Sequence, residues 1–173
     1  EEIRPETPPG PKTSDFSSNR ILPPVTGTGC TPVTTALPEN YGVFDLETKY
    51  SAQEVGGWSK ADLMGVSVGV VYDGKLDEYV SYLEDEVQEM IDHLHRFDLI
   101  AGFNSKRFDN RVLSAYTDRD LQRLPMLDLL EAVHDQLNYR LSLDRLAEHT
   151  LGIKKSAAGL QALEWYRQGR IEE

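Results

Sequence analysis

From Tyr41 onward, apolar and polar positions follow one another with two recurring periods. Where every second residue is apolar, the period is that of a strand, whose successive side chains point to opposite faces of a sheet. Where apolar residues recur three and four positions apart, the period is that of a helix with one buried stripe. These patterns predict strands over residues 41–48, 63–72, 78–82, 99–103 and 124–127, and helices over 84–97, 108–116, 129–137, 143–151 and 157–167.

The order of these elements predicts an α/β fold. A turn at Asp73-Gly74 joins the second and third strands as a hairpin, so the first three strands form an antiparallel meander. Strands and helices then alternate, which is typical of parallel strands with helices against the sheet. Capping side chains favour helix starts at Asp128 and Ser142, and Gly152 favours the end of the second of these helices. We therefore expect one mixed sheet flanked by helices.

Residues 1–40 show neither period. They hold eight of the chain's nine prolines, among serine, threonine and glycine residues. Such a composition cannot bury enough apolar surface to offset the entropy cost of ordering the chain. We expect a disordered linker rich in proline, serine and threonine over residues 1–40, followed by one domain over residues 41–173.

The charge balance of the chain is acidic. It has 18 lysine and arginine residues against 29 aspartate and glutamate residues, a formal net charge of −11. A protein that binds nucleic acid through its overall charge is usually basic, so this class is disfavoured. A nuclease is not excluded, because an enzyme that holds divalent cations through carboxylates engages phosphate through the metal ions and a local basic patch.

Cysteine content and hydropathy indicate the cellular compartment in which the protein is expected. Cys30 is the only cysteine, which excludes an internal disulfide, argues against a cysteine-rich zinc site and favours a reducing cytoplasm. No apolar run reaches the ~20 residues that a membrane helix needs, so we expect no membrane association. The first residues contain neither an initiator methionine nor a signal sequence, which indicates an excerpt of a longer protein.

Two carboxylates lie in the first predicted strand, within the segment Val43 to Thr48. Because side chains alternate along a strand, Asp45 and Glu47 share one face, and Phe44 and Leu46 share the other. Two neighbouring carboxylates repel each other and resist desolvation, and a hard divalent cation with oxygen ligands relieves both effects. The alternative is a solvent-facing strand with two ordinary surface acids.

A third carboxylate, Asp109, comes at the start of a predicted helix, after the apolar strand 99–103 and a polar elbow over residues 104–107. Ligands bind at the carboxyl ends of strands in α/β sheets, so Asp109 is placed to join Asp45 and Glu47. Its alternative role is a helix cap or a favourable charge in the first helical turn. Taken together, the three acids favour a metal site.

The same segments resemble the DEDD-type 3′–5′ exonucleases of the ribonuclease-H-like superfamily. Asp45 and Glu47 match the Asp-x-Glu of the first motif, and Asn104 to Asp109 matches the Asn-x-x-x-Phe-Asp that ends the second. The resemblance covers about residues 41–173. Further segments are similar to the YprB-like branch, whose members are often found beside helicase or other domains: Phe44 to Thr48, Glu54 to Trp58, Gly102 to Asn104, Leu127 to Leu130, Arg140 to Leu143 and Lys155 to Leu163.

This resemblance implies a ribonuclease-H-like fold and a two-metal hydrolysis of phosphodiester bonds from the 3′ end of single-stranded DNA or RNA, with Mg²⁺ or Mn²⁺ as cofactor. Asp45 would bridge both ions, Glu47 would ligate one of them and orient the water, and Asp109 would bind the other. A helicase or other domain, fused or associated, is an implied partner. The family's third motif, a tyrosine or histidine followed by a last aspartate, would fall after Glu173, so we expect the domain to be truncated before it.

Five further residues are candidates for substrate binding. By the resemblance, Thr48 and Asn104 would steady the terminal nucleotide. Lys106, Arg107 and Lys155 would line a phosphate track, because cations near a metal site offset the acidic surface. The alternative for these three is that they are ordinary solvated side chains.

Three other functions compete with this interpretation. A nuclease-fold module that binds nucleic acid or a protein partner without cutting would lack the residues of the third motif. Endonucleolytic ribonuclease H activity is compatible with the same fold, because a fold does not fix the chemistry. A structural cation-binding domain is disfavoured, since the chain lacks a calcium-loop pattern.

Overall fold

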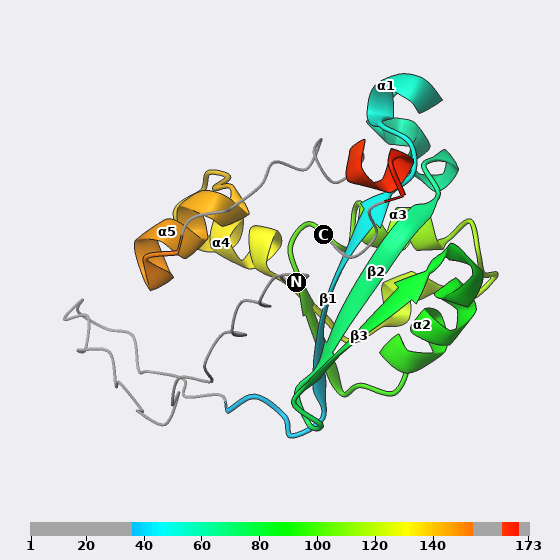
Figure 1. Ribbon diagram of the computed structural model, residues 1–173. Helices are drawn as coiled ribbons and strands as arrows, with labels where there is room; N and C mark the ends of the chain where they lie inside the picture. The colour runs from blue at the N-terminus through cyan, green and yellow to red at the C-terminus, as the bar shows by residue number, and fades with distance from the viewer. Residues whose placement is uncertain (1–35, 154–163, 170–173) are drawn as a thin grey trace, which may run out of the picture. The chain divides into compact units, whose positions relative to one another are not determined.

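A five-stranded mixed sheet organises the part of the chain that the computed structural model describes, residues 36–153 and 164–169. The strand order is β3-β2-β1-β4-β5. Figure 1 labels the first three of these strands, which lie side by side. β2 pairs antiparallel with both β1 and β3, whereas β4 pairs parallel with both β1 and β5. The prediction of an antiparallel meander extended by parallel strands is confirmed. The strands are β1 (Tyr41–Thr48), β2 (Val66–Asp73), β3 (Glu78–Leu83), β4 (Leu99–Gly102) and β5 (Met126–Asp128).

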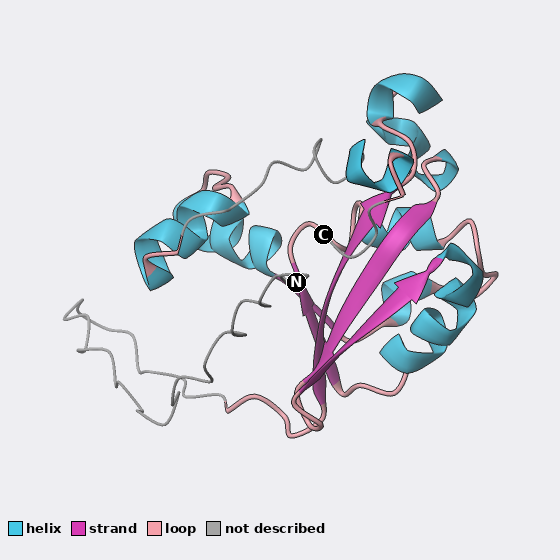
Figure 2. Ribbon diagram, viewed as in Figure 1, coloured by secondary structure: helices cyan, strands magenta, loops and turns pink. Residues whose placement is uncertain are grey.

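Short helices lie in every connection except the turn between β2 and β3, and two α-helices follow β5 directly along the chain (Figure 2). The last two have the bounds predicted from their caps, 129–137 and 143–151. The α-helices are α1 (Ala52–Val55), α2 (Val87–Leu94), α3 (Asp109–Leu113), α4 (Leu129–Leu137) and α5 (Leu143–Leu151), and the 3-10 helices are η1 (Trp58–Leu63), η2 (Glu84–Glu86) and η3 (Leu121–Arg123).

The second strand is shorter than the predicted range 63–72. Leu63 and Met64 continue the alternating pattern, but Leu63 belongs to η1 and Met64 ends that helix. Gly65, with a φ of 63°, then turns the chain into the strand at Val66.

Two helices are also shorter than predicted. The range 84–97 contains the 3-10 turn η2 and then α2, which ends at Leu94, and the range 108–116 contains the five residues of α3. Residues 164–167 are helical, whereas residues 157–163 of the last predicted helix lie outside the described residues.

The predicted linker falls mostly outside the structure. Residues 1–35 are not among the described residues, and residues 36–40 contain no helix or strand. Within the part of the chain that is described, no helix is long and apolar enough to cross a membrane.

One face of the sheet forms the hydrophobic core. Phe44 and Leu46 of β1 are buried there with apolar residues of α2 and α3. Their cross-strand partners on β2 are Val71 and Gly69, which share this face. A Cβ atom at Gly69 would lie 2.4 Å from the sulfur of Met90, so the glycine allows α2 to pack closely against β2. Close packing of this kind fixes α2 on the core face.

The opposite face of the sheet, here called the open face, is partly exposed in the described residues. Along β1 it carries Val43, which is 40% exposed, together with Asp45 and Glu47. The partners of these two acids on β2 are Val70 and Val68, which are also partly exposed. The carboxylates of β1 therefore point away from the core, where a ligand can reach them.

Candidate active site

The site begins where the pairing of two parallel strands ends. β1 pairs with β4 only from Tyr41 to Val43, whereas it pairs with β2 as far as Thr48. The pairing ends there because β4 stops at Gly102, whereas β1 continues to Thr48. The carboxyl ends of neighbouring parallel strands are the usual ligand sites of α/β sheets.

Asp45 and Glu47 lie on β1 just beyond the end of this pairing, on the open face. Their neighbours Phe44 and Leu46 are buried in the core, as the alternation predicts. Asp45 is exposed and Glu47 is partly buried. Two ordinary surface acids would be exposed as well. Whether these residues form a metal site therefore depends on what lies next to Asp45.

Asp109, the first residue of α3, supplies that neighbour. It is 2% exposed, and its Oδ1 atom has no hydrogen-bond partner among the described residues. Burial and, next, the negative charge of Asp45 raise the pKa of Asp109 from 3.8 to about 7, and hydrogen bonding offsets only part of the rise. The two carboxyl groups therefore interact across the gap between β1 and α3.

The capping alternative for Asp109 does not describe what is found. The residue at the N-cap of α3 is Phe108, and no side-chain capping hydrogen bond is formed there within the described residues. A buried acid beside a second acid is destabilising unless a cation or a proton compensates it. The other part of the alternative is found, since Asp109 is the acidic residue in the first turn of α3, but a first-turn charge alone does not explain why this carboxyl group is buried next to Asp45.

Carboxylate oxygens are the donors that Mg²⁺ and Mn²⁺ prefer, and Asp109 offers a buried oxygen that lacks a partner in the described part of the chain. The donor chemistry of Asp45 and Asp109 therefore fits a divalent cation. The structure does not bring three ligands together: no group of three or more His, Cys, Asp or Glu side chains within residues 36–153 and 164–169 could hold a metal ion. The predicted set of Asp45, Glu47 and Asp109 stays a prediction as a ligand set.

A cleft of about 1250 Å³ opens beside Glu47. Thr48 and Asn104, both predicted to bind substrate, line it, and so does Trp58. Trp58 is 72% exposed and meets the ring of Phe108 edge-on, with 5.8 Å between the ring centroids. The cleft thus combines a carboxylate, two small polar side chains and an accessible aromatic surface.

The three predicted phosphate-binding cations have different outcomes. The Nζ atom of Lys106 lies 2.9 Å from Oε2 of Glu131, so its charge is partly neutralised. Arg107 is exposed and lines a second, smaller cavity. Lys155 lies outside the described residues.

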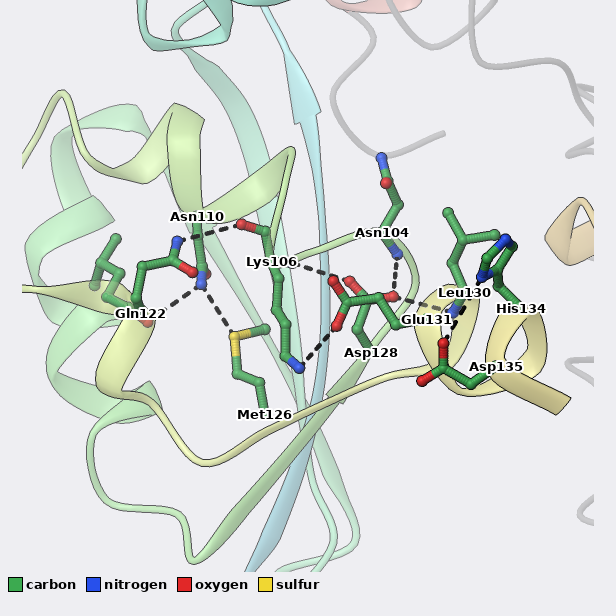
Figure 3. Close-up of polar contacts among 11 residues, drawn as sticks. Asn104, Lys106, Asn110, Gln122, Met126, Asp128, Leu130, Glu131, His134 and Asp135 are labelled. Atoms are coloured by element: carbon green, nitrogen blue, oxygen red, sulfur yellow. Dashed lines mark hydrogen bonds and ion pairs between the residues drawn. The ribbon is translucent and has the colours of Figure 1, made fainter. Parts of the chain in front are cut away.

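Asp128, at the end of β5, has a role that the sequence did not show. It is 2% exposed and accepts hydrogen bonds from the backbone amides of Leu130 (3.0 Å), Asn104 (2.9 Å) and Lys106 (3.1 Å) (Figure 3). The first of these bonds is the predicted helix cap. The other two hold the loop between β4 and α3, where Asn104 has a left-handed φ of 65°. Asp128 therefore fixes the loop that leads into Asp109.

Replacing Asp128 by alanine is expected to lower the free energy of unfolding by about 3–5 kcal/mol, because three backbone amides lose a buried charged acceptor. Urea denaturation measures the loss. Asp120→Ala is the matched control, since Asp120 is an exposed cap that accepts from the single amide of Gln122. Its removal should cost about 1 kcal/mol. Equal losses in the two variants would contradict the role assigned to Asp128.

Comparison with known proteins agrees with the fold and identifies the family. The sequence profile of the RNase H superfamily matches residues 43–169, so the chain belongs to that superfamily. Among solved structures, the chain is similar to the family B DNA polymerase from the hyperthermophilic archaeon Pyrobaculum calidifontis, with 18% sequence identity and a TM-score of 0.56. That match covers 76% of this chain and 21% of the polymerase chain, and at this identity it shows the fold alone. No curated protein matches the sequence.

Proposed function

We propose that this protein is a metal-dependent 3′–5′ exonuclease that hydrolyses phosphodiester bonds of single-stranded DNA or RNA. The observation that supports it most is the buried carboxyl group of Asp109, which interacts with Asp45 and has an oxygen without a partner in the described residues. A divalent cation would compensate the buried carboxylate of Asp109 in place of a proton, and carboxylate oxygens are ligands that such a cation prefers. Membership of the RNase H superfamily supports the same chemistry.

In this proposal Asp45, Glu47 and Asp109 hold Mg²⁺ or Mn²⁺, with two ions in the complete domain. When bound, such a pair activates water and stabilises the leaving 3′ oxygen. Asp109 would give up its proton on binding a cation, because the cation replaces the proton as the compensating charge.

The remaining residues of the cleft bind and orient the strand. The hydroxyl of Thr48 donates to the carbonyl oxygen of Tyr50 (3.0 Å), so its own oxygen is left to accept a hydrogen bond from a terminal 3′-hydroxyl. Asn104 would hold the terminal nucleotide from the other wall, and Trp58 would stack on a base. Lys106 and Arg107, with Lys155, would contact phosphates.

We propose further that the protein belongs to the YprB-like branch of the superfamily and has a helicase or other domain as a partner, fused or associated. The motif resemblance supports both statements. Cys30, as the only cysteine, supports a reducing compartment such as the cytoplasm.

One observation favours a second candidate, a nuclease-fold module that binds nucleic acid or a protein without cutting. Within the described residues, no three candidate metal ligands come together. Such a module would bind oligonucleotides equally well with and without a divalent cation, and would leave them intact.

The proposal is tested with the full-length protein and a single-stranded oligonucleotide, DNA or RNA, that carries a 5′ label. In Mn²⁺ or Mg²⁺ we expect labelled products that shorten one nucleotide at a time, and in EDTA no cleavage. Release of the labelled 5′ nucleotide as the first product would contradict the polarity. Internal fragments would indicate an endonuclease, and binding without cleavage would favour the non-catalytic module.

A further inference from the structure

A second cavity lies next to the candidate active site. It has a volume of about 230 Å³, and its walls come from the loop after β4, from α4 and from the loop before α5. Figure 3 shows Asn104 on the first of these segments and Leu130, Glu131, His134 and Asp135 on α4. The lining residues are Asn104, Arg107, Leu130, Glu131, His134, Asp135 and Arg140.

The charges around this cavity are of two kinds. Of the two acidic residues in the lining, Glu131 pairs with Lys106 at 2.9 Å. Asp135 lies 3.7 Å from Nδ1 of His134, a contact that is an ion pair only when the imidazole is protonated. The two arginines, Arg107 and Arg140, form no ion pair within residues 36–153 and 164–169. Two guanidinium groups are therefore available in a cavity of a chain whose net charge is −11.

Asn104 connects this cavity to the cleft beside Glu47, since it lines both. Its backbone is held in place by Asp128, and its left-handed φ of 65° marks a sharp turn of the loop at this position. A strand whose end occupies the larger cleft would therefore pass Asn104 before it reaches the two arginines.

We infer that this cavity binds a backbone phosphate of the substrate strand, on the 5′ side of the bond that is cut, through Arg107 and Arg140. The identity of the strand rests on the proposed function. Guanidinium groups match phosphate geometry by paired hydrogen bonds, and they are effectively always protonated. The volume is below the ~300 Å³ at which pockets for whole small molecules begin, so the cavity suits a phosphate and its waters rather than a complete nucleotide. The preferred substrate is therefore a strand with several phosphates.

Arg140→Ala tests the inference through binding alone. The probe is a fluorescently labelled single-stranded oligothymidylate, measured by anisotropy at several salt concentrations with Ca²⁺ in place of Mg²⁺. We expect Kd to rise about tenfold and the slope of log Kd against log salt to fall by about 1. Arg140→Lys should restore part of the slope, because it keeps the charge. Arg123→Ala is the control, since Arg123 is an exposed arginine of η3 that pairs with Asp120 outside this cavity, and it should change neither quantity.

A neutral methylphosphonate, placed at one linkage at a time, locates the contact. At one linkage near the 3′ end, the increase in Kd caused by the methylphosphonate and the increase caused by Arg140→Ala should not add, because both changes remove the same contact.

Equal Kd values and equal salt slopes for Arg140→Ala and Arg123→Ala would overturn the inference. Additive increases in Kd at every linkage would overturn it as well. If Arg140→Ala weakens binding, its effect is not additive with the methylphosphonate, and the unmodified protein does not cleave in Mn²⁺, the phosphate site is upheld and the exonuclease is overturned. If the unmodified protein cleaves but Arg140→Ala binds as tightly as it does, the exonuclease is upheld and the phosphate site is overturned. If the unmodified protein does not bind the strand, both are overturned.

Discussion

Replacing Asp45 by asparagine in the full-length protein is expected to lower the rate of metal-dependent strand cleavage by a factor on the order of 10³ or more. Asp45 is the exposed acid that interacts with the buried carboxyl group of Asp109, so the substitution removes one of the proposed metal ligands. Folding should be retained, because asparagine has nearly the same shape and relieves the repulsion between the two acids. The measurement is the initial rate of 5′-labelled product formation in Mn²⁺, beside thermal unfolding in EDTA.

Asp118→Asn is the matched control for this experiment. Asp118 is an exposed loop residue between α3 and η3, and the substitution changes the net charge by the same amount. Its cleavage rate should equal that of the unmodified protein. Undiminished cleavage by the Asp45→Asn variant would show that the chemistry takes place elsewhere in the molecule.

Replacing Asp109 by asparagine is expected to raise the free energy of unfolding of the metal-free protein, by up to about 4 kcal/mol at about pH 8. The pKa of Asp109 is raised from 3.8 to about 7, so the folded protein keeps a proton that the unfolded chain releases. Stability contributed by this proton is present at acidic pH, and it is lost as the pH rises from about 4 to about 7. The side chain of the asparagine variant does not ionise, so the stability of the variant does not fall with pH for this reason. Urea denaturation in EDTA at about pH 5 and about pH 8 measures the loss, and the difference between the two proteins should be less than half as large at the lower pH.

Asp73→Asn provides a control of opposite sign. Burial raises the pKa of Asp73, but hydrogen bonds from the amide of Leu76, from His93 and from the amide of Lys75 outweigh it and hold the pKa below its ordinary value. The charge of Asp73 therefore stabilises the fold at neutral pH, and its removal should destabilise the protein there.

Equal unfolding free energies for the Asp109→Asn variant and the unmodified protein at about pH 8 in EDTA would contradict an uncompensated acid at position 109. Added Mn²⁺ should stabilise the unmodified protein and not the variant.

The elements that could be predicted from the sequence are those whose ends depend on local chemistry. α4 and α5 begin after Asp128 and Ser142, whose side chains accept from amides of the first turn, and α5 ends at Gly152 with a left-handed φ of 69°. These are interactions within a few residues, so the sequence contains all of their information. β1 was predictable for the same reason, since the alternation of Phe44, Asp45, Leu46 and Glu47 is a property of the strand itself.

The arrangement of the site depends on contacts that the sequence does not signal. The end of the β1–β4 pairing at Val43 depends on how two distant strands align. Asp128 binds the amide of Asn104 across 24 residues, and a capping aspartate without that contact would look the same in the sequence. Arg140 precedes α5 in a loop, where an arginine is ordinarily a solvated residue. Only the fold shows that it shares a cavity with Arg107.

The position of β1 in the sheet has a consequence for synthesis on the ribosome. Among the strands of the described residues, β1 is made first and is also the central strand of the sheet; its partner β2 follows next, whereas β4 and β5 are made later. The meander can therefore form from local contacts while the second edge of β1 is still unpaired. An unpaired strand edge invites association with other chains, and the charges of Asp45 and Glu47 at its far end discourage it. The same two carboxylates would thus protect the nascent chain before Asp109, the third acid of the candidate site, has been added.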